Sequence, residues 1–415
     1  MIPRILVCSL QVGAGASKGH LNPLIGLVQW LVRAGAEVGW LALPSRMGAA
    51  DRAQVEAQGV TVLETPPVPD GVILADAELA RLALDPDRVW EVYRSFLLDP
   101  LPSLVEPVRE MVREFAPHAA VCDGMSYAGI LGCALEGVPW VGLGAGLKIL
   151  KEGGFAGAYM GDLDPLLAPR ARAFAQAGVD AEFRLFECVS PHANVVYTTR
   201  AFVGDLPLPA NTHLVGPATP PDARGDDVEF PWDRLDGRPL VYVAFGSVYT
   251  RLVLESLNDA IGRAAARLGV QLVVSSEALA GRPLPPGWPA DALVLPYVPQ
   301  PALLARAAAF VTHGGANSVM EGLAHGVPLL VVPLSSDQPW QAELVRRAGV
   351  GEALARHEAT PELVAEALAR LVDPAGAPRA KARAVAESYA RADGAQAAAR
   401  LVLDLAASRA PEEES

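Results

Sequence analysis

The sequence predicts an α/β protein with two domains, each built on a parallel β-sheet. Apolar segments of strand length alternate with segments of helical periodicity through most of the chain. With 415 residues, 51% of them hydrophobic, the chain is longer than one core usually serves. The segment 217–231, rich in Pro, Gly and Asp, has the composition of a linker. We therefore expect Rossmann-like domains over residues 1–216 and 237–394, a linker over 217–236, and a C-terminal helix with an acidic tail over 395–415.

Composition and charge exclude several classes of function. Acidic residues outnumber basic ones 47 to 34, which argues against a nucleic-acid partner. The four cysteines lack C-x-x-C spacing, so reduced thiols in a cytoplasmic protein are expected. The apolar start, Ile5 to Leu10, imitates a signal peptide, but Gln11 interrupts it and cleavage would remove the first strand. No apolar run approaches the ~20 residues of a membrane-spanning helix.

The first strand, Ile5 to Leu10, leads through a Gly/Ala-rich loop to His20, where a helix begins. A dinucleotide fingerprint does not fit this corner, because the glycines at 13, 15 and 19 are one residue too widely spaced. A P-loop does not fit either, because Lys18 precedes its glycine. His20 therefore lies at the ligand edge of the predicted sheet, although a lone histidine is more often structural.

Further strands and helices follow in the first half. The expected strands are 37–43, 60–64, 119–122, 140–143, 194–198 and 213–215, and the expected helices are 105–115 and 126–135. Asp123 comes directly after one of these strands and just before a helix. A helix-capping aspartate and a functional one are equally compatible with that position.

Two first-half segments, 66–100 and 147–191, lack regular patterns and carry scattered aromatic side chains. The string Asp162-Leu163-Asp164 in the second segment imitates a metal-binding Asp-x-Asp motif. We discount it, because it follows no apolar strand and a hard divalent cation usually needs more oxygen ligands.

The second half continues the alternation. The expected strands are 240–245, 271–275, 292–295, 307–311 and 329–332, and the expected helices are 361–372, 378–389 and 395–407. The first of these strands runs into the glycine turn Gly246-Ser247.

The stretch 310–341 concentrates the chemistry of the second half. A strand ends at His313, Gly314 and Gly315 turn the chain, and Asn317 and Ser318 open a helix whose positive end favours a phosphate. Glu321, one turn later, can accept two hydrogen bonds from a ribose diol. The pair Asp337-Gln338 follows the next strand, at the same sheet edge. Together these groups predict a nucleotide-sugar site.

This stretch, extended back to Tyr297-Val298-Pro299-Gln300, resembles the donor signature of family 1 glycosyltransferases, the UDP-dependent enzymes that include plant and bacterial macrolide glycosyltransferases. The resemblance implies that Tyr297 stacks on uracil, that the backbone of Val298 pairs with its edge, and that Gln300 approaches the ribose. It also implies the following contacts: Ser247, His313, Gly315, Asn317 and Ser318 at the diphosphate, Glu321 at the ribose, and Asp337 with Gln338 at the sugar. Tyr297 stands where many members have Trp, and Ala316 where plant members have a large Trp.

The string Gly19-His20-Leu21-Asn22-Pro23 and the Asp123 segment also resemble this family, whose catalytic histidine and aspartate occupy these positions. The resemblance implies the GT-B architecture, two Rossmann-like domains facing a cleft, with the last helix returning to the first domain. It implies an acceptor site in the irregular segments, for which the candidates are Trp90, Tyr93, Phe96, Phe155 and Tyr159. Packing in a small core is an equally good interpretation of these rings.

The expected activity is inverting transfer of a hexose, with UDP-glucose as donor, to a hydroxyl of a small hydrophobic acceptor such as a polyketide, macrolide or phenolic natural product. We expect no cofactor and no metal, and a monomer or weak dimer. A UDP-sugar epimerase or hydrolase on the same fold, and a non-catalytic nucleotide-sugar-binding protein, are the alternatives.

Overall fold

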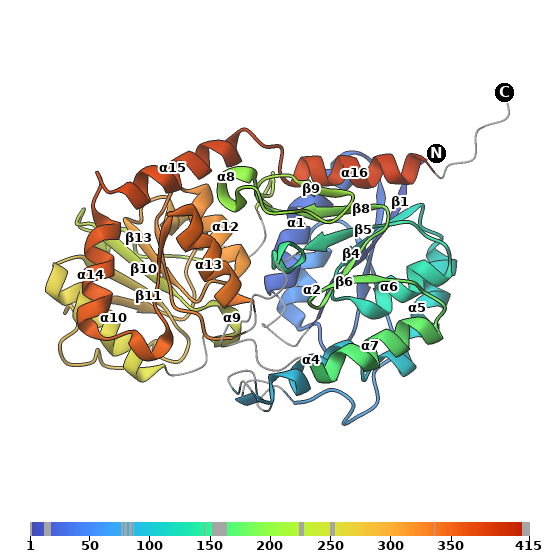
Figure 1. Ribbon diagram of the computed structural model, residues 1–415, viewed down its shortest axis with the longest axis horizontal. Helices are drawn as coiled ribbons and strands as arrows, with labels where there is room; N and C mark the ends of the chain where they lie inside the picture. Colours follow the sequence, from blue (N-terminus) through green and yellow to red (C-terminus); the bar gives the residue numbers. More distant parts are fainter. Residues whose placement is uncertain are drawn as a thin grey trace. The chain divides into compact units, whose positions relative to one another are not determined.

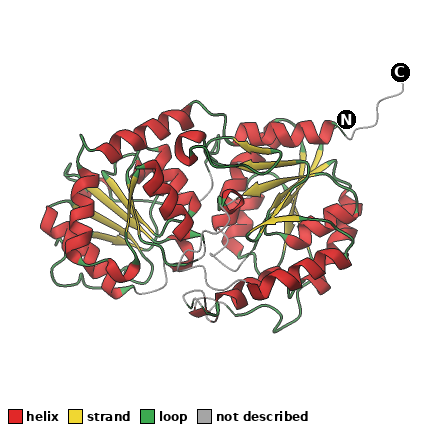
Figure 2. Ribbon diagram, in the orientation of Figure 1, coloured by secondary structure: helices red, strands yellow, loops and turns green. Residues whose placement is uncertain are grey.

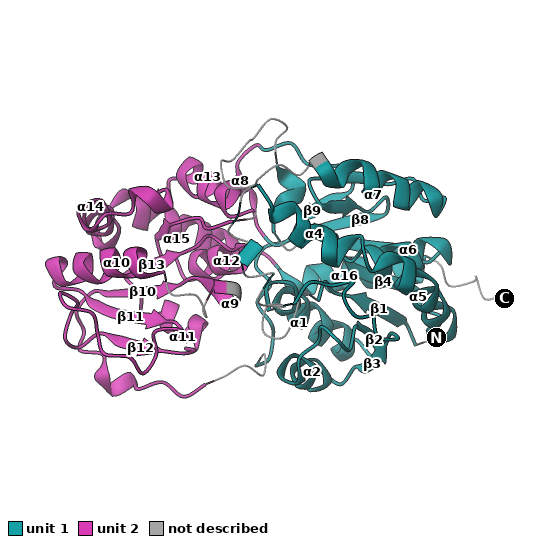
Figure 3. Ribbon diagram, turned by 90° about the horizontal axis from the view of Figure 1, so that it is seen from below, with its two compact units in different colours: residues 1–197, 206–225, 393–415 teal, residues 198–205, 226–392 magenta. Residues whose placement is uncertain are grey.

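The protein is described from a computed structural model (Figure 1). The structure describes residues 2–11, 18–75, 78, 81–82, 85, 87–144, 146–151, 164–223, 228–249, 254–335 and 337–408, and only the backbone of 164, 247 and 248. The chain forms two compact units (Figure 3). Unit 1 comprises Met1–Tyr197, Leu206–Gly225 and Asp393–Ser415, and unit 2 comprises Thr198–Asp205 and Asp226–Ala392. Each unit has a parallel sheet with helices packed against it (Figure 2).

The sheet of unit 1 has seven strands in the order β3-β2-β1-β4-β5-β8-β9. Their bounds are β1 Arg4–Cys8, β2 Glu37–Ala42, β3 Thr61–Glu64, β4 Ala119–Asp123, β5 Trp140–Gly144, β8 Ala193–Val196 and β9 Thr212–Leu214. All neighbours pair in parallel. The central strands are buried on both faces, which is why they appear in the sequence as continuous apolar runs.

The helices of unit 1 are α1 Lys18–Arg33, α2 Ala49–Glu56, α4 Val89–Leu97, α5 Leu101–Phe115, α6 Tyr127–Leu135, α7 Asp164–Gln176 and α16 Ala395–Ala407, with the 3-10 turn η1 Lys148–Leu150. On β4, Cys122 lies beside Cys133 of α6, whereas the next residue, Asp123, contacts His20 of α1. Because successive strand side chains point to opposite faces, α1 and α6 cover opposite faces of the sheet.

The C-terminal helix α16 belongs to unit 1, where it packs against α1, β4 and β5. Close approach is possible because the contact is made by small residues. A Cβ added to Gly26 of α1 would lie 3.1 Å from the Cβ of Ala395. The Gly394 N–H also donates to the Val215 carbonyl at 2.7 Å, so the chain is tied to unit 1 just before the helix begins.

The sheet of unit 2 has six parallel strands in the order β12-β11-β10-β13-β14-β15. Their bounds are β10 Leu240–Ala244, β11 Gln271–Ser275, β12 Leu293–Leu295, β13 Ala309–Thr312, β14 Leu329–Val331 and β15 Gly351–Ala353. The helices are α8 Arg200–Val203, α9 Gly246–Tyr249, α10 Glu255–Leu268, α11 Gln300–Leu304, α12 Ala316–Ala324, α13 Gln338–Ala348, α14 Pro361–Val372 and α15 Ala377–Ala390, with the 3-10 turns η2 Trp232–Arg234 and η3 Arg356–Glu358.

The segment Thr198–Asp205 falls in unit 2, although it was expected in a first domain over 1–216. Its helix α8 packs against α13 and α15. Two side-chain hydrogen bonds add to this packing: the Thr198 and Tyr389 hydroxyls are 3.1 Å apart, and the Ser388 hydroxyl donates to Thr199 at 2.8 Å. The two hydrogen bonds join residues 191 and 189 positions apart, so the local pattern does not contain them.

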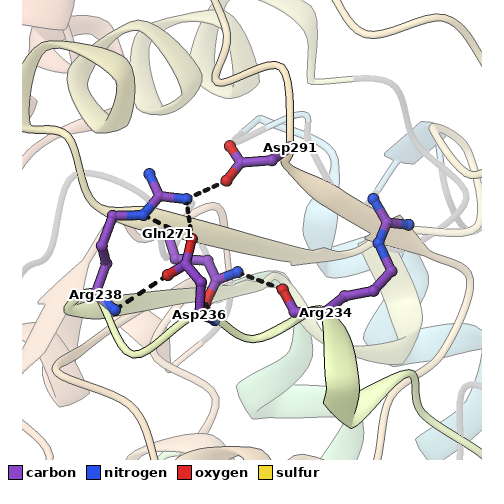
Figure 4. Close-up of polar contacts among 5 residues, drawn as sticks. All are labelled: Arg234, Asp236, Arg238, Gln271 and Asp291. Atoms are coloured by element: carbon purple, nitrogen blue, oxygen red, sulfur yellow. Dashed lines mark hydrogen bonds and ion pairs between the residues drawn. The ribbon is translucent and has the colours of Figure 1, made fainter.

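A polar network links the segment before β10 to the start of β11 in unit 2 (Figure 4). The buried Gln271 side chain, at the start of β11, accepts from the Asp236 N–H at 3.2 Å and donates to the Arg234 carbonyl at 2.7 Å. Arg238, just before β10, pairs with Asp236 at 2.6 Å and also with Asp291. The network lies at the amino-terminal ends of the strands, so it anchors the edge of the sheet opposite their carboxyl ends.

Part of the segment 147–191 is regular after all. Helix α7 is followed by an antiparallel hairpin of β6 Glu182–Arg184 and β7 Glu187–Val189. The rings of Phe174 and Phe183 meet edge to face at 4.9 Å, and Tyr127 of α6 contacts both.

No helix in the described ranges is both long and apolar enough to cross a membrane.

Candidate active site

His20 and Asp123 lie at the point in unit 1 where the strand order reverses. His20 is in the first turn of α1, which follows β1, and Asp123 is the last residue of β4. Strands β1 and β4 are neighbours, but the chain builds β2 and β3 on one side of β1 before it crosses to β4 on the other. In open α/β sheets, such a switch point leaves a crevice outside the carboxyl ends of the strands.

The two side chains form a close pair. His20 Nδ1 lies 2.6 Å from Asp123 Oδ2, and the side chains are 18% and 1% exposed. The other carboxylate oxygen, Oδ1, accepts from the Met125 N–H at 2.8 Å. The N-cap of α6 is Ser126, so Asp123 is not the helix-capping residue. With both oxygens placed, the carboxylate orients the imidazole with Nδ1–H toward Asp123, which leaves Nε2 as the proton acceptor.

The candidate donor residues lie at the corresponding edge of unit 2. Gly246 follows β10, Tyr297 follows β12, His313 follows β13 and Asp337 lies in the loop after β14. The order of this sheet reverses between β10 and β13, so Gly246 and His313 lie at its switch point. Ser247 is within α9, but its side chain is outside the described part of the structure.

His313 is enclosed by two glycines. A Cβ on Gly246 would lie 2.7 Å from the imidazole, and one on Gly315 would lie 2.6 Å from it. Gly246 and Gly314 also have φ of +74° and +88°, which suit glycine. The ring is 8% exposed, and burial lowers its pKa to about 4 while the charge of Asp337 opposes the shift. His313 is therefore neutral at neutral pH, so it can offer a phosphate a hydrogen bond but no positive charge.

Helix α12 supplies backbone N–H groups next to His313. Its N-cap is Gly315, which has no side chain with which to cap the first turn. Asn317 and Ser318 are the second and third residues of the helix, with Ser318 buried and Asn317 half-buried. An uncapped N-terminus with flanking polar side chains has the chemistry of an anion site.

Gln300 and Glu321 form one hydrogen-bonded unit. The Gln300 amide nitrogen donates to Glu321 Oε2 at 2.8 Å, and its amide oxygen accepts from the Tyr242 hydroxyl at 3.0 Å. Nearby, the Tyr297 ring is 45% exposed and available for stacking, whereas the Val298 side chain is buried. Tyr242 was not among the expected site residues. Its only signal in the sequence is a hydroxyl inside the otherwise apolar strand 240–245.

The Gln338 side chain is fixed by hydrogen bonds to neighbouring groups of the protein. Its buried amide oxygen accepts from the backbone N–H groups of Leu334 and Ser335 at 2.7 and 2.9 Å, and its nitrogen donates to the Tyr249 hydroxyl at 3.3 Å. Tyr249 also bonds Ser335 and packs edge to face on His313 at 5.8 Å. The amide oxygen is therefore saturated by the loop itself, and only the nitrogen retains a hydrogen for a sugar hydroxyl.

The proposed acceptor residues divide into two groups. Tyr93 is buried and stacks on Phe186 at 4.1 Å, with Trp90 and Phe96 packed against the same core. The Tyr93 ring is therefore packed in the core against Phe186 of the β6–β7 region, and a role in acceptor binding stays a prediction for Trp90, Tyr93 and Phe96. Phe155 and Tyr159 lie outside the described residues, as does Asp162, and Asp164 begins α7 with its side chain outside the description.

Comparison with known proteins finds glycosyltransferases. The sequence model of the family described as "UDP-glucoronosyl and UDP-glucosyl transferase" matches residues 179–376. The chain is 28% identical to the uncharacterized UDP-glucosyltransferase YojK of Bacillus subtilis, over 57% of this chain and 58% of that protein. It is 28% identical to the oleandomycin glycosyltransferase of Streptomyces antibioticus, over 93% of this chain and 88% of that protein.

The crystal structure of the glycosyltransferase of kitacinnamycin superposes with a TM-score of 0.73 at 21% identity, covering 98% of this chain and 99% of that one. The two parallel-sheet units of this chain therefore have the GT-B fold. More narrowly, residues 179–376 carry the sequence pattern of the UDP-glucoronosyl and UDP-glucosyl transferase family.

Proposed function

We propose that this protein transfers a hexose from a UDP-sugar, UDP-glucose in the first instance, to a hydroxyl of a small hydrophobic acceptor with inversion at the anomeric carbon. The observation that carries the proposal is the 2.6 Å contact between His20 and the buried Asp123. A histidine held in one tautomer by a buried carboxylate is the arrangement that activates a hydroxyl nucleophile.

Unit 2 binds the donor in this proposal. Tyr297 offers a half-exposed ring to the base, Glu321 a carboxylate to the ribose, and α12 its positive end to the diphosphate. The neutral His313 donates a hydrogen bond, so the helix dipole and backbone N–H groups carry the electrostatic part of diphosphate binding. Asp337 and the remaining Gln338 hydrogen contact the sugar.

Unit 1 supplies the base. The Nε2 atom of His20 takes the proton of the acceptor hydroxyl as the oxygen attacks the anomeric carbon, and the bond to the diphosphate oxygen breaks with its electron pair leaving on UDP. Asp123 stabilises the imidazolium that forms. One displacement inverts the configuration, so an α-linked donor yields a β-glycoside. No step requires a cofactor or a metal ion.

The acceptor is a small hydrophobic alcohol such as a polyketide, macrolide or phenol. Similarity to an oleandomycin glycosyltransferase over most of the chain supports a natural product of this kind. We further propose a cytoplasmic enzyme that is a monomer or weak dimer. Transfer to highly charged acceptors, with none to phenols or macrolides, would refute the acceptor class.

The test is a pair of variants assayed with UDP-glucose and a panel of aromatic and macrocyclic alcohols. His20→Ala lowers turnover roughly 10²–10⁴-fold with UDP affinity nearly unchanged, the usual effect of removing a positioned base. Asp123→Asn lowers turnover more than it weakens UDP binding. The matched control is His118→Ala, because His118 precedes β4 at the opposite end of the strand, where it accepts from the Arg4 N–H at 2.9 Å.

Two results would overturn the mechanism: an α-glycoside product, or near-normal turnover of His20→Ala. Incubation of the donor without acceptor separates the competing functions. A new sugar nucleotide identifies an epimerase, rapid release of UDP and free sugar identifies a hydrolase, and UDP-glucose binding without any product identifies a binding protein.

A further inference from the structure

Three of the four cysteines converge inside unit 1. Cys8 of β1 and Cys122 of β4 are register partners on neighbouring strands, and Cys133 of α6 lies above them. The three sulfur atoms all lie within 4.8 Å of one another, and all three side chains are fully buried. A Cβ on Gly129 would lie 2.5 Å from the Cβ of Cys8, so a glycine in α6 makes room for this cluster.

The spacing suits one thiophilic atom. If its bonds to sulfur are about 2.3 Å long, as in zinc thiolate sites, tetrahedral angles place the sulfurs about 3.8 Å apart. Because the observed sulfur–sulfur distances are at most 4.8 Å, each would have to shorten by at most about 1 Å to bind one atom. Within the described part of the chain, the group contains no fourth histidine, cysteine or carboxylate ligand.

The net charge of the occupied site decides which metal or metalloid ion it can bind. The thiols lie in an apolar core with Leu6, Val108 and Ile130. Three thiolates around a monovalent ion would leave a buried charge of −2, and around a divalent ion −1. An uncompensated buried charge is strongly unfavourable. A trivalent centre with three thiolates is neutral.

We propose that Cys8, Cys122 and Cys133 form a binding site for one trivalent arsenic atom. Arsenous acid reacts with the three thiols, three As–S bonds replace three As–O bonds, and three water molecules leave. No electron is transferred and no other reactant is needed. Because the thiols are buried, uptake requires local opening of unit 1 and is slower than at exposed thiols.

The test uses the full chain, reduced and kept under nitrogen, incubated with sodium arsenite for several periods and then freed of unbound arsenic by gel filtration. We expect one arsenic per chain, with an intact mass that rises by one arsenic less three hydrogens. Cys122→Ala and Cys133→Ala should retain less than a tenth of this arsenic. Cys188→Ala is the matched control, because Cys188 is a buried cysteine outside the cluster, and it should retain all of it.

The mass measurement needs only the unchanged protein, so the proposal is testable even if a variant does not fold. Absence of retained arsenic from the native protein would overturn the site, as would equal retention by Cys133→Ala. Retention of zinc or copper(I) but not of arsenic would overturn the charge argument.

A different observation, in unit 2, concerns Tyr242. This buried tyrosine stacks on Phe310 at 4.8 Å. Its hydroxyl donates a hydrogen bond to the amide oxygen of Gln300, and the amide nitrogen of Gln300 donates one to Glu321. The amide can satisfy both neighbours in only one orientation. We infer that Tyr242 is a positioning residue that fixes Gln300 and Glu321 for the ribose, an inference that rests on the donor role proposed for Glu321.

Tyr242→Phe removes only the hydroxyl. We expect UDP affinity to fall roughly 3- to 10-fold, the usual effect of one lost buried hydrogen bond, and the affinity for 2′-deoxy-UDP to change little. The matched control is Tyr389→Phe, because Tyr389 is another buried tyrosine of unit 2 whose hydroxyl bonds Thr198. It should leave both affinities unchanged.

Glu321→Ala separates the two possible failures. If Glu321→Ala reduces the preference for UDP over 2′-deoxy-UDP but Tyr242→Phe does not, the positioning role of Tyr242 is refuted and the donor site stands. If neither variant changes UDP binding, the donor role of Glu321 is itself wrong.

Discussion

His313 makes folding depend on pH in a way that can be calculated. Burial between Gly246 and Gly315 lowers its pKa to about 4, against 6.5 for an ordinary histidine. The unfolded chain therefore binds a proton at this residue below pH 6.5, while the folded chain does so only near pH 4. Stability from His313 is fully present above pH 6.5 and is lost as the pH falls through this window.

The size of the effect follows from the two values. One pKa unit corresponds to about 1.4 kcal/mol, so the complete loss between pH 6.5 and pH 4 is about 3.5 kcal/mol. At pH 5, where the unfolded residue is almost fully protonated and the folded residue is not, the loss is about 2 kcal/mol. At pH 7.5 it is negligible.

His313→Gln removes the titrating group. At pH 7.5 the variant should be less stable than the unchanged protein, because it loses the packing of the imidazole on Tyr249. The difference in free energy of unfolding should shrink by about 2 kcal/mol between pH 7.5 and pH 5, because only the unchanged protein loses the histidine contribution. Urea unfolding curves of both proteins at the two pH values measure it. A difference that does not change with pH would refute the burial argument.

Three further outcomes are expected. Glu321→Ala should weaken UDP binding by about 1–3 kcal/mol in calorimetry, because the ribose loses a charged acceptor, and tighter binding of dTDP-sugars than of UDP-glucose would count against the donor assignment. Turnover should survive EDTA, because in the proposed donor site backbone N–H groups and a helix end, rather than a cation, stabilise the diphosphate. Strict dependence on added magnesium or manganese would contradict this. Gly262→Ala should destabilise unit 2 by about 1–3 kcal/mol in thermal or urea unfolding, because its Cβ would lie 2.2 Å from the Trp288 ring. Gly19→Ala is the control and should not destabilise the protein, because nothing lies within 4 Å of its Cβ. Equal effects of the two substitutions would exclude the packing explanation.

Local pattern was sufficient for most of the secondary structure. The strand 271–275 and the helices 361–372 and 395–407 have the predicted bounds. Buried parallel strands are continuous apolar runs, and these helices carry one apolar face, so both signals lie within a few neighbouring residues. The same logic placed His20 and Asp123 at one sheet edge, because parallel strands end together.

Contacts between distant segments decided the rest. The 2.6 Å approach of His20 to Asp123 joins residues 103 positions apart, and the stacking of Tyr93 on Phe186 depends on a hairpin that the sequence did not predict. The orientation of Gln300 is set by a hydroxyl on another strand. Which hydrogen-bond partner a polar side chain finds, and whether an aromatic ring is covered, depend on side chains brought together only by tertiary packing.

The sequence by itself therefore determined the two sheets, the strand ends that carry the polar groups, and the class of ligand these groups suit. Only the tertiary structure decided that His313 is enclosed and neutral, that the Gln338 oxygen is occupied, and that three thiols meet. The reason is physical: chemical type and periodicity are properties of neighbouring residues, whereas burial and hydrogen-bond saturation are properties of the space between segments far apart in the chain.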